Sequence, residues 1–142
     1  MKNGWNVFLL IIVLGGLVFP CVLHASDAAE KTAVTSSAAW LSLVDEGKFS
    51  ESWDQAAGYF RNAVTKDQWL ASLKAVRPPL GKAVTRKLKS KMYTKTLPGA
   101  PDGEYVVIIF DTQFENKKSA VETVTPMLDK DGKWRVSGYY IK

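Results

Sequence analysis

The segment EYVVIIFDTQF, residues Glu104–Phe114, gives the clearest indication of the fold. Its residues alternate between two faces with a period of two, which is typical of a β-strand. The more apolar set is Val106, Ile108, Phe110, Thr112 and Phe114. The opposite set is also apolar as far as Ile109, so both faces of this strand are expected to be covered. The pattern therefore predicts a central strand of a sheet.

Three further strands follow the same period and surround this stretch. We expect them at about Val84–Thr96, Ala120–Leu128 and Lys133–Ile141. Short polar connections join the four strands at Pro98–Gly103, Asn116–Ser119 and Asp131–Gly132. Because consecutive short connections reverse the chain each time, the sheet should be antiparallel.

The last strand allows two arrangements. On simple alternation, Trp134 and Val136 share a face with Tyr140. A bulge at Gly138 would bring Tyr139 and Ile141 to the opposite face from the one that alternation gives them.

The chain before the strands shows helical periodicity instead. Helices are expected at about Ser37–Glu46, at Phe49–Asn62, and from Thr65 to the Pro78-Pro79 pair. Gly47 is placed to end the first of them. In the third, Thr65 and Gln68 fit a capping box. Its expected buried stripe is Trp69, Leu70, Leu73 and Val76. Helices first and an antiparallel sheet second predict an α+β fold with the helices on one face of the sheet.

The first 25 residues read as a secretory signal. Lys2 supplies the positive start, Val7–Val18 the apolar run, and cleavage is expected between Ala25 and Ser26. The apolar run holds about a dozen residues, short of the roughly 20 that span a bilayer. A retained anchor and a lipoprotein attached at Cys21 are the alternatives. We expect a signal peptide over 1–25, a flexible leader over 26–37 and one domain over 38–142.

Cleavage would place the protein in the periplasm or outside the cell and remove its only cysteine and only histidine, Cys21 and His24. A mature chain without them has no Cys/His zinc site, no disulfide and no Ser-His or Cys-His relay. No catalytic residue, metal site or cofactor is therefore expected. Losing Lys2 from the 19 basic residues leaves 18 against 14 acidic ones, a net charge of +4. This modest excess does not indicate nucleic-acid binding.

Three residues are candidate ligand-binding residues. Arg86 and Glu122 each lie among apolar neighbours on their strands. Two opposite charges directed at an apolar interior should pair, because either one alone would cost several kcal/mol. The alternative is that one or both reach water at the margin of the sheet. Trp134, an aromatic side chain on a strand, is the third candidate.

Lysines repeat on alternate positions of the first strand: Lys87, Lys89, Lys91 and Lys95. Such a row can bind anionic lipids or wall polymers. It can equally be an edge strand that uses lysines to prevent aggregation.

Several segments carry a resemblance to a known family. They are Trp40–Phe49 with Ser52-Trp53 after it, Arg77–Gly81, Leu97–Tyr105, Phe114–Lys117 and Asp131–Ile141. Over about Ala39–Lys142 the chain resembles short bacterial exported proteins grouped as domain of unknown function 4019. The order of elements is also similar to the nuclear transport factor 2-like or cystatin-like cone. That resemblance implies a curved four-stranded sheet, a pocket and, in some members, a homodimer joined through the sheet; it does not determine function.

Two kinds of function remain open. The first is an exported, non-catalytic binding or accessory domain of the bacterial envelope, holding a small apolar or amphipathic ligand or an envelope protein. Contact with the membrane is then expected only through an uncleaved signal. The second is an isomerase or lyase whose base is a buried carboxylate in the cone pocket. Glu122 with Arg86, or Asp111 with a tyrosine, would supply that base.

Overall fold

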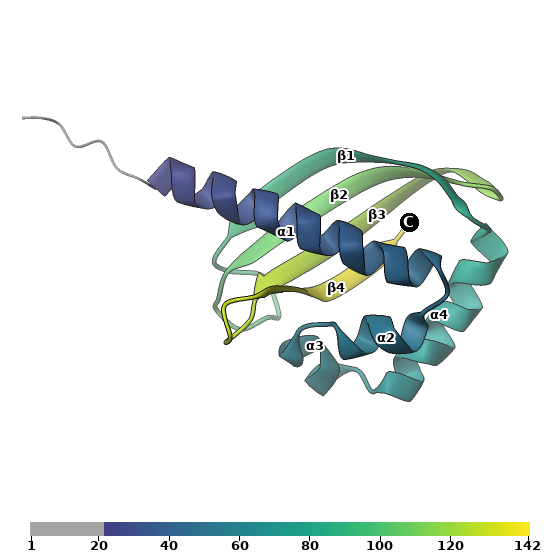
Figure 1. Ribbon diagram of the computed structural model, residues 1–142, viewed down its shortest axis with the longest axis horizontal. Coiled ribbons are helices and arrows are strands. Elements are labelled where there is room, and N and C mark those ends of the chain that lie inside the picture. Colours follow the sequence, from purple (N-terminus) through teal and green to yellow (C-terminus); the bar gives the residue numbers. More distant parts are fainter. Residues whose placement is uncertain (1–21) are drawn as a thin grey trace, which may run out of the picture.

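The computed structural model describes residues 22–142. Helices come first in this part of the chain: α1 (Val22–Asp45), α2 (Phe49–Asp54), α3 (Gly58–Ala63) and α4 (Lys66–Leu80). Four strands follow: β1 (Ala83–Thr94), β2 (Tyr105–Phe114), β3 (Lys117–Leu128) and β4 (Trp134–Ile141). Figure 1 shows this order. Most of the predicted signal peptide, residues 1–21, lies outside the described residues.

The strands form one antiparallel sheet in the order β1-β2-β3-β4. This confirms the predicted α+β fold and the central position of β2. β3 begins at Lys117, earlier than the expected Ala120, because Glu115 and Asn116 alone make the turn. A tight turn lets the ladder start at once, and Phe114 pairs directly with Lys117.

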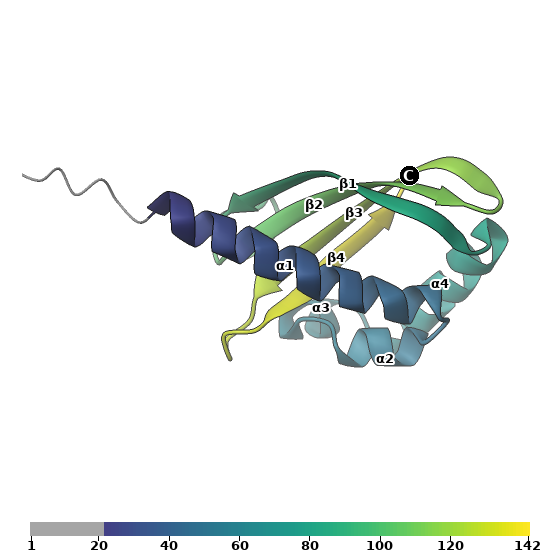
Figure 2. The ribbon, with the colours of Figure 1, turned by 45° about the horizontal axis from the view of Figure 1, so that its top comes forward.

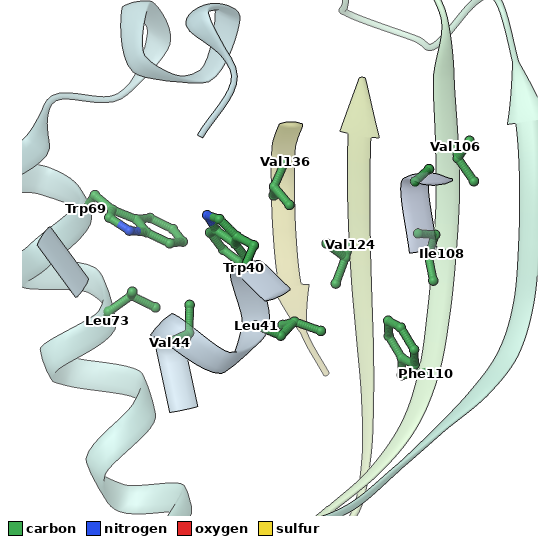
Figure 3. Packing of buried hydrophobic residues seen from close by; sticks show 11 residues of the cluster. Trp40, Leu41, Val44, Trp69, Leu73, Val106, Ile108, Phe110, Val124 and Val136 are labelled. Carbon is green, nitrogen blue, oxygen red and sulfur yellow. The ribbon is translucent and has the colours of Figure 1, made fainter. Parts of the chain in front are cut away.

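The helices pack on one face of the curved sheet, which we call the inner face (Figure 2). α1 crosses this face diagonally, and its apolar side chains fill the space between the sheet and α4 (Figure 3). The buried cluster is Ala33, Trp40, Leu41, Val44, Trp69, Leu73, Val106, Ile108, Phe110, Val124 and Val136. Aromatic rings contact one another at its centre. The centroid of the Trp40 ring lies 5.9 Å from that of Trp69 and 5.3 Å from that of Tyr139.

Register shifts change which side chains face inward on both edge strands. In β4 the pairs Thr125–Gly138 and Pro126–Val136 leave Ser137 unpaired. Tyr139 consequently lies on the same inner face as Val136. The bulge that the sequence allowed at Gly138 is therefore present, one position earlier. In β1 the shift falls between Leu88 and Ser90 and leaves Lys89 as the extra residue.

Residues 26–37 are not a flexible leader, and that prediction is wrong. They belong to α1, where Ala33 and Ser37 are fully buried. Glu30 also reaches β1, where its carboxylate accepts a hydrogen bond from the backbone N–H of Tyr93 at 3.2 Å. Contact with the sheet thus stabilises a helix that composition alone did not indicate. α1 ends as predicted at Gly47, which has a φ of +75°.

The single helix expected over Phe49–Asn62 is divided into α2 and α3, so that prediction is also wrong. The break lies at Gln55–Ala57. There the N–H of Ala57 donates to the carbonyl of Val136 in β4 at 2.8 Å. A tertiary hydrogen bond replaces the helical one, which a local pattern cannot indicate.

α4 confirms its predicted beginning and corrects its predicted end. Thr65 and Gln68 form both hydrogen bonds of the capping box. The helix continues through Pro78 and Pro79 to Leu80 instead of stopping before them. Proline has no backbone N–H, but both prolines lie in the last turn, so only that turn lacks donors. Gly81, with a φ of +74°, ends the helix.

Candidate functional site

Glu122 is the centre of a polar cluster within the apolar interior. It lies on the inner face of β3 with 0% of its surface exposed. Arg86 of β1 donates from Nε to Glu122 Oε1 at 2.7 Å and from Nη2 to Oε2 at 3.3 Å. The predicted pairing of Arg86 with Glu122 is confirmed. It spans β2, because the two residues lie on strands that are not neighbours.

Two hydroxyl groups complete the surroundings of this carboxylate. Thr112 of β2 donates to Oε1 at 2.6 Å, and Tyr139 of β4 donates to Oε2. Burial, together with the negative charge of Glu122, raises the pKa of Tyr139 far above its ordinary value. Tyr139 therefore stays protonated and continues to donate at alkaline pH. Each oxygen of Glu122 thus accepts two hydrogen bonds.

The charges continue from Arg86 to the end of α1. Asp45 accepts from Nη1 of Arg86 at 2.8 Å and from Nη2 at 3.0 Å. Asp45 also accepts from Nη2 of Arg77, in α4, at 2.9 Å. Burial alone would lower the pKa of Arg86, but its hydrogen bonds to Asp45 and Glu122 raise it above the ordinary value. We call Asp45, Arg77, Arg86 and Glu122 the ion network; its formal charges cancel.

Arg77, like Asp45, is a member of the ion network that the sequence did not predict. It is 5% exposed, and its guanidinium carbon lies 4.6 Å from the centre of the Phe114 ring. Val76, predicted to be buried in its place, is 46% exposed. The available signal was the spacing of Trp69, Leu73 and Arg77 by four residues, which places them on one helix face. Because arginine is mostly exposed in folded proteins, this spacing alone does not predict that Arg77 is buried.

A groove opens beside the ion network, between the ends of α1 and α4 and the β2–β3 turn. Its volume is about 310 Å³. The lining residues are Val44, Asp45, Glu46, Gly47, Phe49, Arg77, Pro78, Gly81, Lys82 and Glu115. Asp45 is the member of the ion network best placed to meet a ligand there, but its oxygens already accept hydrogen bonds from two guanidinium groups.

The second candidate base, Asp111 with a tyrosine, does not form the predicted pair. Asp111 lies on the outer face of β2 and pairs with Lys89 at 3.3 Å. A proton-transfer site needs a carboxylate with a free lone pair that faces a substrate. Glu122, with its four donors, lacks a free lone pair. Asp111 is about half exposed on the outer face, so it is not the buried carboxylate of an apolar pocket that the prediction required.

Trp134, the third predicted site residue, lies apart from Arg86 and Glu122. It is at the start of β4, where it packs against the buried cluster. It also lines a second groove of about 400 Å³ together with Gln55, Lys133 and Arg135. The structure therefore brings two of the three predicted residues together and leaves the third at a different groove.

The lysine row of β1 does not exist as one surface. Lys87 pairs with Asp111, an outer-face residue, whereas Lys91 pairs with Ile108 on the inner face. The bulge at Lys89 changes the parity between them. Lys91 lies 3.5 Å from Glu30 of α1, which partly neutralises it. The lysines of β1 therefore do not form a continuous row on one face of the sheet.

Residues 22–142 contain no cluster of three or more His, Cys, Asp or Glu side chains that could hold a metal ion. Over the same residues, no helix combines the length and apolar character that crossing a bilayer requires.

Comparison with known proteins gives one match. The family model "Protein of unknown function (DUF4019)" matches residues 36–139, which include the last ten residues of α1, the helices α2 to α4, the strands β1 to β3 and most of β4. No curated protein and no solved structure matches the chain. The likeness to the nuclear transport factor 2-like cone accordingly stays a prediction. With most of its length covered by the family model, the chain belongs to the DUF4019 family.

Proposed function

We propose that the protein is a non-catalytic binding or accessory domain of the bacterial envelope. The observation that carries this proposal is the saturation of Glu122, the most deeply buried acid of the site. Its two oxygens accept four hydrogen bonds, from Arg86, Thr112 and Tyr139. A carboxylate held in this way joins all four strands but has no lone pair left for a substrate proton. The ion network thus supports a rigid scaffold and gives no support to the isomerase or lyase alternative.

The location in the envelope is proposed from the first 25 residues. When the full chain is expressed in a bacterial host, we expect it in the periplasm with Ser26 as its first residue, because Val7–Val18 is too short to remain as an anchor. Cell fractionation with intact mass spectrometry checks this. Val13→Arg is the control, since a charge in the apolar run should keep the chain unprocessed in the cytoplasm. A full-length product in the membrane, or a lipidated chain starting at Cys21, would contradict cleavage at Ser26.

The binding function is tested by ligand-induced stabilisation. We expect at least one compound among envelope lipids, wall fragments and small hydrophobic metabolites to raise the melting temperature with increasing concentration. A ligand at 100 times its Kd stabilises the folded state by about 2.7 kcal/mol. The variant Trp134→Ala, at the 400 Å³ groove, separates binding there from binding elsewhere. The small-ligand form of the proposal fails if no compound shifts the melting temperature, and a protein partner then becomes the form to test.

A further inference from the structure

The outer edge of β4 has backbone groups that point away from the sheet. Val121 and Lys142 exchange both backbone hydrogen bonds, at 3.0 and 2.9 Å. Hydrogen-bonded and non-hydrogen-bonded pairs alternate in an antiparallel ladder. Ile141 and Tyr139, one and three residues earlier, therefore direct their N–H and C=O groups outward. Within residues 22–142, no hydrogen bond reaches these outward groups.

Two other places on the sheet edges are covered. At the start of β4, the carbonyl of Val136 accepts the N–H of Ala57. On β1, the outward N–H of Tyr93 donates to Glu30, which also pairs with Lys91. Proteins usually protect edge strands with such covers and charges. The segment Tyr139–Ile141 has neither a covering segment nor a charged side chain, so its outward backbone groups are open to a further strand.

An apolar groove runs beside this open edge, between α4 and β4. Its volume is about 230 Å³. Its lining residues are all uncharged: Trp69, Ser72, Leu73, Val76, Tyr139, Tyr140 and Ile141. Val76 on one rim is 46% exposed and Tyr140 on the other is 62% exposed. We call this groove together with the edge of Tyr139–Ile141 the β4 groove.

We propose that the β4 groove binds a short, extended, apolar segment of a partner polypeptide, which adds a fifth strand beside β4. The backbone of the segment would pair with Tyr139 and Ile141, and its alternate side chains would enter the groove. A charged segment is disfavoured, because the lining residues could not compensate a buried charge. This inference rests on the proposed binding function and names the site and the class of partner.

The size of the site favours a peptide segment over a second folded copy. The open edge is three residues long, about 10 Å at the usual rise of a strand. A stable dimer buries about 800 Å² on each partner. A three-residue edge beside a groove of about 230 Å³ supplies only a small part of such an interface. One strand with two or three inserted side chains fits that volume.

An array of synthetic peptides tests the proposal with the protein as the bacterial host exports it. Each peptide is about nine residues long, with Thr at alternate positions, Val, Ile, Leu, Phe or Tyr between them, and Lys at both ends. We expect binding by fluorescence anisotropy for members of this array. Methylating the backbone nitrogens along one edge of the best peptide should weaken its binding at least about tenfold, because it removes the donors that β4 would meet.

Variants of the protein locate the binding. Ile141→Pro removes an outward N–H without breaking a bond to β3, and Val76→Glu places a charge on the rim. Both should weaken binding at least about tenfold. Lys74→Glu, on the other side of α4, is the matched control and should leave binding unchanged. Circular dichroism and melting temperatures show whether each variant folds.

Two results would overturn the proposal. One is an array in which no peptide binds the wild-type protein. The other is unchanged binding by folded Val76→Glu and Ile141→Pro. Either result leaves the broader binding function open to the ligand panel, because stabilisation by a lipid, a wall fragment or a metabolite does not depend on the edge of β4.

Discussion

Replacing Glu122 with alanine should lower the free energy of unfolding by about 3–5 kcal/mol. The side chain is fully buried and accepts hydrogen bonds from Arg86, Thr112 and Tyr139. Its removal leaves two buried hydroxyl groups without their acceptor and removes one of the two carboxylates that neutralise Arg86. With the stability of small domains at about 5–15 kcal/mol, this single change would remove a large part of it.

Urea unfolding followed by tryptophan fluorescence measures this loss. Glu51→Ala is the control, because Glu51 is an exposed acid in the first turn of α2 and should change stability by less than about 0.5 kcal/mol. Removing Arg86 and Glu122 together, as Arg86→Leu with Glu122→Leu, should cost less than the sum of the two single changes. A loss below about 1 kcal/mol for Glu122→Ala would show that the ion network does not hold the strands together.

Trp40→Ala should cost about 3–5 kcal/mol of unfolding free energy. Trp40 of α1 is 3% exposed, and its ring contacts Trp69 of α4 and Tyr139 of β4. Its Nε1 also donates to the carbonyl of Ser52 at 2.8 Å. The truncation therefore creates a cavity in the centre of the inner face and leaves a buried carbonyl without its donor.

Two further variants separate these contributions. Trp40→Phe keeps most of the volume but removes the donor to Ser52, so its cost should be clearly smaller than that of Trp40→Ala. Trp134→Ala is the matched control, since Trp134 is only partly buried at the start of β4. Equal costs for Trp40→Ala and Trp134→Ala in the same urea measurement would contradict the central role of Trp40.

The features predicted correctly depend on neighbours in the chain. The period of two over Glu104–Phe114 indicated a central strand, and β2 has β1 and β3 on its two sides. The capping box at Thr65 and the stop at Gly47 are likewise made by residues within a few positions of each other. Local geometry and local hydrogen bonds decide such features, so a sequence pattern is sufficient to indicate them.

The site was predictable in part for a similar reason. Two opposite charges on apolar strand faces favour a pair, with water at the margin of the sheet as the alternative, and the structure shows the pair Arg86–Glu122. Asp45, Arg77 and Tyr139 did not follow. Tyr139 reaches Glu122 only because Ser137 bulges, and Arg77 reaches Asp45 only because α1 and α4 end side by side.

Patterns along the chain were enough to predict the order of helices and strands, the antiparallel sheet and a candidate pair of buried charges. The tertiary structure makes residues 26–37 helical, breaks the helix after Phe49 and turns the lysines of β1 to opposite sides. No local pattern specifies these last features, because they depend on contacts between distant segments. The sheet supports the first half of α1, β4 takes the N–H of Ala57, and the register with β2 leaves Lys89 as a bulge.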